Sequence, residues 1–190
     1  ESSAANTLEL LENLLTWARS QRGEIRFSPG WYDIKEVVED AIKIYEFKAI
    51  TKKITLVNEC RESMVCRFDR NMIKTTIANL LNNATKYTPK NGSVVIKVLK
   101  DKENINVSVL DNGIGMDSEV LEHIFALDNS HYSADGTEGE KGSGLGLILC
   151  REFVETHNGE IFVNSEPGKG SEFQFSIPCK LQDSNSNIVL

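Results

Sequence analysis

The sequence predicts an α+β fold, a two-layer sandwich in which helices cover one face of a mixed, mainly antiparallel sheet and a long helix precedes the domain. Apolar residues recur every three or four positions in three segments, residues 34–52, 70–88 and 145–157. They alternate with polar residues in two pairs of segments, 93–98 with 105–109 and 160–164 with 172–177. The first pattern is typical of amphipathic helices and the second of half-buried strands.

Residues 1–24 predict the leading helix. Its apolar residues form two neighbouring rows, one of Ala4, Leu8, Leu11, Leu15 and Ala18 and one of Leu10, Leu14 and Trp17. Two rows require more than one packing partner, and no second helix stands beside this one before Gly23. We therefore expect one helix of a bundle whose other helices lie outside this chain. The alternative is that the helix packs on the domain that follows.

The domain itself is expected over residues 25–180, with a polar tail over 181–190. Residues 25–33 predict a short strand or linker, and residues 54–57 predict a strand. Asp33 and Asp69 are N-cap candidates for the first two helices of the domain, and Pro89 helps to end the second. Tight turns at 101–104 and 167–170 close two hairpins. A polar stretch without clear periodicity, residues 126–141, predicts a mobile lid over a site.

Composition limits the class of function. The net charge is −7 and no lysines or arginines cluster, which argues against binding to nucleic acid. No apolar run approaches the roughly 20 residues of a membrane span, so we expect no membrane contact and a cytoplasmic location. The four cysteines, Cys60, Cys66, Cys150 and Cys179, lack metal-type spacing. Reduced structural thiols are the expectation.

The helix at residues 70–88 contains more asparagine than its folding requires. Asparagine is a poor helix former, about 0.6 kcal/mol worse than alanine at an interior position. Spacings of three and four place Thr76, Asn79, Asn83 and Lys86 on one helix face beside the apolar stripe. That face offers amide oxygens and one cation, which suit a metal ion and phosphate groups.

Two glycine-rich segments add to this pattern. Asp111 ends a predicted strand and is followed by Gly113 and Gly115, so a carboxylate stands where the backbone can approach a flat ligand. The run 142–146 directly precedes a helix, where free N–H groups and the helix dipole favour phosphates. Neither motif is specific alone, because Asp-Asn-Gly is commonly a turn, and the run matches neither a dinucleotide fingerprint nor a P-loop.

In combination and in this order, the motifs resemble the ATP-binding catalytic domain of sensor histidine kinases, within the superfamily of gyrase, chaperone and mismatch-repair ATPases. Residues 79–88 resemble the asparagine box of that family, 111–115 and 142–147 its two glycine boxes, and 124–125 its phenylalanine box. Residues 170–173 resemble its closing strand motif, and residues 14–19 resemble part of the second helix of the dimerisation hairpin.

The resemblance implies a site for ATP and Mg²⁺. Asn83 would coordinate Mg²⁺, an ion that prefers oxygen ligands, and Asn79 would assist near the phosphates. Lys86 would meet the terminal phosphates, and Tyr87 would lie along the ribose or adenine. Asp111 would accept a hydrogen bond from the adenine amine, with Ser171 nearby and Gly113 and Gly115 in the adjoining loop. Phosphate donors would be Gly142, Ser143, Gly144, Leu145 and Gly146, with a phosphate contact also from Lys141. We expect Phe125 to pack at the hinge of the lid.

One position separates a kinase from an ATPase. ATP-hydrolysing members of the superfamily carry a glutamate four residues before the metal-binding asparagine, where this chain has Asn79. An amide is no base near neutral pH, so transfer to a histidine nitrogen is favoured over hydrolysis.

The phosphoacceptor is expected outside this chain. His123, His131 and His157 all lack the acidic residue, basic residue and proline that follow the acceptor histidine in this family. The fragment should therefore not autophosphorylate alone. The resemblance implies a homodimer through the helical hairpin of the full-length protein and a response regulator receiver domain as partner. The alternatives are a nucleotide-gated interaction module and a serine kinase of the anti-sigma type.

Overall fold

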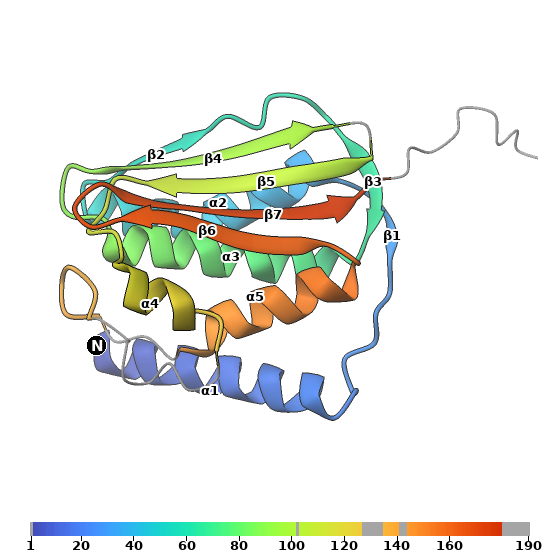
Figure 1. Ribbon diagram of the computed structural model, residues 1–190, viewed down its shortest axis with the longest axis horizontal. Helices are drawn as coiled ribbons and strands as arrows, with labels where there is room; N and C mark the ends of the chain where they lie inside the picture. The colour runs from blue at the N-terminus through green and yellow to red at the C-terminus, as the bar shows by residue number, and fades with distance from the viewer. Residues whose placement is uncertain (1, 102, 127–134, 141–143, 180–190) are drawn as a thin grey trace, which may run out of the picture.

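The computed structural model describes residues 2–101, 103–126, 135–140 and 144–179. Its main sheet has five strands in the order β2-β4-β5-β7-β6 (Figure 1). Only β2 and β4 run parallel, and every other neighbouring pair is antiparallel. This confirms the predicted mixed, mainly antiparallel sheet. The strands are β2 (Thr55–Asn58), β4 (Ser93–Lys100), β5 (Asn104–Asp111), β6 (Glu160–Glu166) and β7 (Gly170–Pro178).

Three helices cover one face of this sheet, as predicted: α2 (Ile34–Thr51), α3 (Arg70–Tyr87) and α5 (Leu145–Thr156) (Figure 1). The central helix, α3, contacts both of the others. The core lies between the layers, where Ile77 and Leu80 of α3 and Val107 and Phe175 of the sheet are fully buried. Alternation along β5 and β7 places their other side chains on the open face of the sheet.

The two predicted N-caps are present. The Asp33 side chain accepts from the backbone N–H of Lys35 at 3.0 Å. The Asp69 side chain accepts from the first turn of α3. The backbone N–H of Asp69 in turn donates to Nε2 of His157 at 2.9 Å, while Nδ1 of that ring lies 2.6 Å from the Phe153 carbonyl oxygen. Burial lowers the pKa of His157. This histidine is therefore a buried side chain that connects α5 to the N-cap of α3.

Two short elements were not predicted. Strand β3 (Val65–Phe68) pairs antiparallel with β1 (Gly30–Asp33) in a separate two-stranded sheet. Helix α4 (Ser118–His123) follows an N-cap at Asp117. Of residues 25–33, which were predicted to form a short strand or linker, only the last four form a strand, β1. Both missed elements are too short for a hydrophobic period to be recognised.

The expectation of four reduced cysteines is wrong for one pair. Cys66 of β3 and Cys179, just after β7, form a disulfide whose Cα atoms lie 5.3 Å apart. Cys60 and Cys150 are free and buried. The pairing was hidden because the two cysteines are 113 positions apart in the sequence, and only the fold brings the ends of β3 and β7 together.

The leading helix α1 (Ser2–Gln21) packs against α5 and lies on the outside of the helical layer (Figure 1). Trp17 joins a small cluster formed by Met72, Leu149 and Phe153, and the Ser20 hydroxyl donates to Glu152. Leu11, Leu14 and Leu15 remain 42–62% exposed. The helix therefore packs on the domain through Trp17 and leaves these leucines uncovered. Across the described residues, no helix combines the length and apolar character that crossing a membrane requires.

Candidate nucleotide-binding site

Three motifs that are distant in sequence gather around α3. The carboxyl end of α3, the loop after β5 and the turn between β6 and β7 meet at the left edge of Figure 1. The Ile114 backbone N–H donates to the carbonyl oxygen of Tyr87 at 3.1 Å, which joins the first glycine box to the end of α3. The Asn79 side chain lies 3.4 Å from the carbonyl oxygen of Gly146, which joins the asparagine box to the second glycine box.

Asn79 and Asn83 differ in their surroundings. Asn79 is half-buried against α5 by its contact with Gly146. Asn83 is also half-buried, but within the described residues its side chain makes no hydrogen bond. An amide oxygen without a protein donor fits a ligand of Mg²⁺, which would take its remaining ligands from phosphates and water. Thr76, which shares the sequence pattern, is fully buried and bonds the carbonyl oxygen of Met72, so it lies outside the site.

Asp111, the last residue of β5, is held by two backbone donors. Its Oδ1 accepts from the N–H of Gly113 at 2.8 Å and from the N–H of Ser171 at 3.3 Å. Burial raises the pKa of Asp111 to about 6, against the lowering effect of these two hydrogen bonds. The side chain is therefore ionised at neutral pH. Fixed by Oδ1, it can present Oδ2 as an acceptor.

Ser165 of β6 is a residue that sequence reasoning missed. Its hydroxyl donates to the carbonyl oxygen of Gly170 at 2.9 Å and lies 3.0 Å from the hydroxyl of Ser171. It also accepts from the backbone N–H of Met116 at 2.9 Å. Ser165 thus fastens the loop after β5 to the hairpin that supplies Ser171. Only the pairing of β6 with β7, which sets Ser165 opposite Ser171, reveals this role.

Gly113 and Gly115 are required by the protein's own packing. A Cβ at Gly113 would lie 2.4 Å from the carbonyl oxygen of Tyr87. Gly115 has a φ of +67°, and a Cβ there would lie 2.0 Å from the carbonyl oxygen of Glu166. Close contact between backbones therefore already requires glycine at both positions. The expectation that these glycines admit a flat ligand stays a prediction.

Lys86 and Tyr87 interact with each other at the end of α3. The Lys86 side chain is buried, and its ammonium lies 2.9 Å from the Tyr87 hydroxyl and 4.6 Å from the centre of the ring. Burial raises the pKa of Tyr87, and the carboxylates of Glu140 and Asp135 raise it further. The predicted contacts of Lys86 with phosphate and of Tyr87 with ribose or adenine stay predictions.

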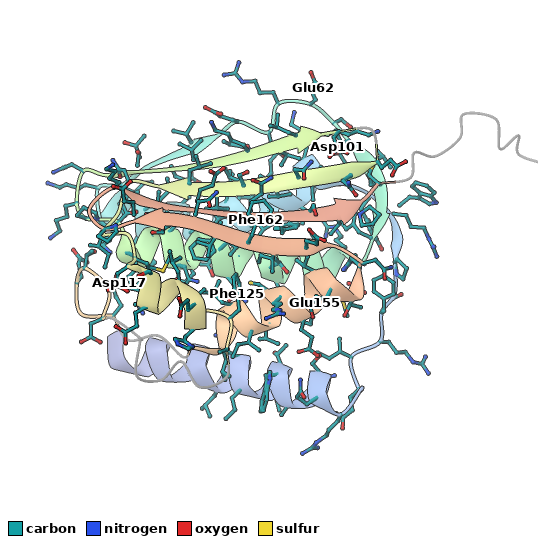
Figure 2. The ribbon with its side chains drawn as sticks, viewed as in Figure 1. Glu62, Asp101, Asp117, Phe125, Glu155 and Phe162 are labelled. Carbon is teal, nitrogen blue, oxygen red and sulfur yellow. A yellow bond between two sulfur atoms is a disulfide. The ribbon has the colours of Figure 1, made fainter. Side chains whose placement is uncertain are left out.

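The phosphate-binding run is described in part. Lys141, Gly142 and Ser143 lie outside the described residues, as do residues 127–134 of the predicted lid. Gly144 is the N-cap of α5 with a φ of +69°, and no described side chain caps this helix. Leu145 and Gly146 begin the first turn of α5, the end of a helix at which the dipole favours phosphate groups. Phe125, just beyond α4 (Figure 2), packs against the main core, and its predicted place at the hinge of the lid stays a prediction.

Comparison with known proteins identifies the family. Residues 68–181 match the family of histidine kinase-, DNA gyrase B- and HSP90-like ATPases. The chain belongs to this family. The adaptive-response sensory kinase SasA of Synechocystis sp. is 32% identical over 171 residues, which cover 89% of this chain and 44% of SasA. The chain thus spans less than half the length of this curated relative.

Solved structures agree with this family. The nucleotide-free catalytic domain of the histidine kinase ThkA is 25% identical with a TM-score of 0.68, covering 82% of this chain and 97% of that one. ThkA in complex with the response regulator TrrA is 25% identical with a TM-score of 0.73, covering 93% and 49%. This chain is therefore an ATP-binding catalytic domain of the histidine kinase type, and its fold is the one predicted.

Proposed function

We propose that this chain is the catalytic part of a two-component sensor histidine kinase that binds Mg²⁺-ATP and transfers the γ-phosphoryl group to a histidine on a dimerisation helix outside the chain. A response regulator aspartate would then receive the phosphoryl group. The observation that carries the proposal is the meeting of the asparagine box with both glycine boxes around α3, through the contacts of Tyr87 with Ile114 and of Asn79 with Gly146.

Each residue then has a distinct task. Asp111 accepts from the adenine amine, held in orientation by Gly113 and Ser171. The N–H groups at the start of α5, together with the preceding residues 141–143, donate to the phosphates. Asn83 holds Mg²⁺, which neutralises phosphate charge when it is bound. Asn79, an amide, activates no water, so the phosphoryl group remains available for a histidine nitrogen.

The remaining parts of the chain fit this assignment. Residues 1–24 would be the second helix of the dimerisation hairpin, and the exposed Leu11, Leu14 and Leu15 would complete the bundle with helices from outside the chain. Residues 25–180 would be the catalytic domain and residues 181–190 a tail. A response regulator is the expected partner, because a relative of this fold, ThkA, forms such a complex. The cytoplasm is the proposed location.

Nucleotide binding is the first test. Calorimetric titration of the chain with ATP, with and without Mg²⁺, should give saturable binding that is stronger with the metal ion. The Asp111→Asn variant should bind more weakly, because the substitution replaces one of the two carboxylate oxygens, both acceptors, with an amide nitrogen, which is a donor. Saturable binding that is equal in the two proteins would contradict the assignment of the adenine pocket.

Phosphoryl transfer is the second test. The chain is incubated with Mg²⁺-ATP labelled in its γ-phosphate and with a separate helical hairpin that carries the acceptor histidine. Label that is stable to base and labile to acid should appear on the hairpin and not on this chain. ATP binding without transfer would favour the nucleotide-gated interaction module, and acid-stable label on serine would favour the anti-sigma type.

A further inference from the structure

Residues 24–29 form the linker between α1 and β1, and this linker lies against the domain. Helix α1 ends in a glycine cap, in which Gly23 has a φ of +66° and donates its N–H to the Ser20 carbonyl oxygen at 2.8 Å. Two residues later, Ile25 packs against the small cluster that also holds Trp17. The linker is therefore docked on the domain almost as soon as α1 ends.

Asp69 holds the linker at a second point. This buried carboxylate caps α3 with Oδ1, which accepts from the N–H groups of Asn71 and Met72 at 3.0 and 3.1 Å. Its Oδ2 accepts from the N–H of Ser28, in the linker, at 2.8 Å. One side chain thus both starts α3 and fixes the linker.

The buried ring of His157 lies at the centre of this arrangement. Its Nε2 accepts from the N–H of Asp69, and its Nδ1 lies 2.6 Å from the Phe153 carbonyl oxygen. The linker residue Phe27 meets the ring edge to face, with the ring centres 4.9 Å apart and the planes at 88°. Because an N–H donates and a carbonyl oxygen accepts, both hydrogen bonds are satisfied only by a neutral ring with its proton on Nδ1.

A second proton on His157 is incompatible with this geometry. Nε2 would then carry a hydrogen that points at the N–H of Asp69, so two donors would face each other. The charged group that faces the ring is the Asp69 carboxylate, at the N-cap of α3, whereas α5 and the linker contribute Phe153 and Phe27. Burial lowers the pKa of His157, against the raising effects of the Phe153 carbonyl oxygen and the Asp69 carboxylate.

The direct contact between α1 and α5 is imperfect. The Ser20 hydroxyl bonds Oε1 of Glu152, and Trp17 packs in the cluster. However, the Trp17 indole N–H and Oε2 of Glu152 are buried without a partner among the described residues. Buried polar groups without partners oppose the contact that buries them. The docked linker therefore adds to what holds α1 on the domain.

We propose that His157 is a pH-sensitive latch for the linker: the neutral ring holds Asp69 and Phe27 in place, and a protonated ring releases the linker and, with it, α1. In the released chain the ring is exposed to water and regains the ordinary pKa of 6.5, whereas the docked ring resists the proton. Release is therefore favoured as the pH falls below 6.5. The latch itself requires no nucleotide. Its consequence, that acidification frees the catalytic domain to move relative to the dimerisation helix, rests on the proposed function.

Trp17 reports release, because it is partly buried where α1 contacts the domain. Trp31→Phe makes it the only tryptophan in the chain. In this background the emission of Trp17 should move to longer wavelength as the pH falls from 7.5 to 5.5, while the far-ultraviolet circular dichroism stays constant. The ratio of released to docked chains should rise by up to about tenfold for each pH unit below 6.5, the limit for one proton.

His157→Gln tests whether this ring is the titrating group. Glutamine is neutral throughout this range, so the emission of Trp17 should be the same at pH 7.5 and pH 5.5. His123→Gln is the matched control, because it removes a histidine of α4 and should leave the pH response unchanged. A pH response that persists in His157→Gln overturns the inference.

Phe27→Ala tests the latch from the linker side, and it decides the matter if His157→Gln fails to fold. Loss of the ring contact should raise the ratio of released to docked chains about two- to tenfold at each pH, so that release begins at higher pH. Arg26→Ala is the control, because Arg26 is adjacent and exposed, and it should titrate as the wild-type chain does.

Three outcomes overturn the inference whether or not the chain binds ATP. The first is an emission of Trp17 that does not depend on pH in the wild-type background. The second is a Phe27→Ala variant that titrates as its parent does. The third is a loss of circular dichroism together with the emission shift, because that result indicates unfolding of the whole domain. Failure to bind ATP contradicts the proposed function and leaves the latch to be judged by these outcomes.

Discussion

At Asp111, burial of a single carboxylate acts against its ionisation. The folded-state pKa of about 6 lies above the ordinary value of 3.8. Since the folded state holds the proton more tightly than the unfolded state, stability falls as the pH rises from about 4 to 6, and the full penalty applies above pH 6. A buried carboxylate retained at such a penalty indicates a functional role. The role proposed for Asp111 is to accept a hydrogen bond from the nucleotide.

A pH-dependent affinity for ATP follows. Protonation of Asp111 removes the acceptor for the adenine amine, so affinity should decline as the pH falls through about 6. Asp111→Asn should bind weakly at every pH and show little of this dependence. It should also stabilise the free chain at pH 7.5, by about 1–3 kcal/mol, because no charge is buried. Calorimetric titration and urea unfolding at pH 5, 6 and 7.5 measure both effects, and a flat affinity profile in the wild-type chain would contradict the assignment.

Asn83 offers the sharpest test of the metal site. Asn83→Ala should abolish the dependence of nucleotide binding on Mg²⁺ while leaving the fold intact, because this side chain makes no hydrogen bond within the described part of the chain. Asn82→Ala is the matched control on the next residue. The Asn82 side chain accepts from the Lys48 ammonium at 3.0 Å, so its loss should lower stability by about 1 kcal/mol.

The readouts for this pair are titrations with and without Mg²⁺ and a thermal melt. Undiminished Mg²⁺-ATP affinity in Asn83→Ala would exclude Asn83 as the metal ligand. A loss of Mg²⁺ dependence in Asn82→Ala would show that the effect is not specific to one asparagine.

At the scale of elements, the site depends on how the loop after β5 packs between α3 and the β6–β7 hairpin. The pairing of β5 with β7 sets Asp111 opposite Ser171. Ser165 then fastens this hairpin to the loop through Met116. The loop itself lies against the backbone of Tyr87 on one side and of Glu166 on the other. The glycine box is therefore a packing motif as much as a binding motif.

A pair of glycine substitutions separates the strain of a positive φ from the steric contact of a Cβ with the neighbouring backbone. Gly115 and Gly168 both have positive φ, of +67° and +75°. A Cβ at Gly115 would lie 2.0 Å from the Glu166 carbonyl oxygen, whereas nothing lies within 4 Å of a Cβ at Gly168. Gly168→Ala should cost about 1 kcal/mol of strain, and Gly115→Ala at least about 1–2 kcal/mol more, because backbone must move. Urea unfolding measures both, and equal values would contradict the packing described here.

At the scale of the whole molecule, the disulfide joins the small β1–β3 sheet to the end of the main sheet. It closes a long loop, since Cys66 and Cys179 are 113 positions apart. The crosslink confines the unfolded chain, and cross-links of this kind typically contribute about 2–4 kcal/mol. Disulfides are rare in the cytosol of most organisms, where this pair would be held reduced and the domain would be less stable.

Reduction should therefore lower the melting temperature of the chain. Alkylation under denaturing conditions should modify two cysteines before reduction and four after it, since Cys60 and Cys150 are free. Cys60→Ser is the control, because its melting temperature should respond to reductant as that of the wild-type chain does. Four reactive thiols in the unreduced chain would contradict the disulfide.

The sequence by itself determined the layers of the fold and supplied the motifs on which the candidate site is proposed. Helices α2, α3 and α5 and the two hairpins were predicted because their signals are local: a period of 3.6 or 2, an N-cap such as Asp69, a proline or a glycine turn. The residues assigned to the nucleotide were found in the same way, as motifs continuous in sequence. The sequence alone also shows Asn79 at the position where ATP-hydrolysing members of the superfamily carry a glutamate.

The tertiary structure alone decided how distant segments meet. The role of Ser165 and the Cys66–Cys179 pairing depend on partners that the fold brings together, and no local pattern encodes such contacts. The same reason explains why β3 was missed, since a strand of four residues is defined by its pairing with β1. The glycines of the first box likewise have their reason in the backbones of Tyr87 and Glu166. Periodicity records which face of an element is buried, but not which other element covers it.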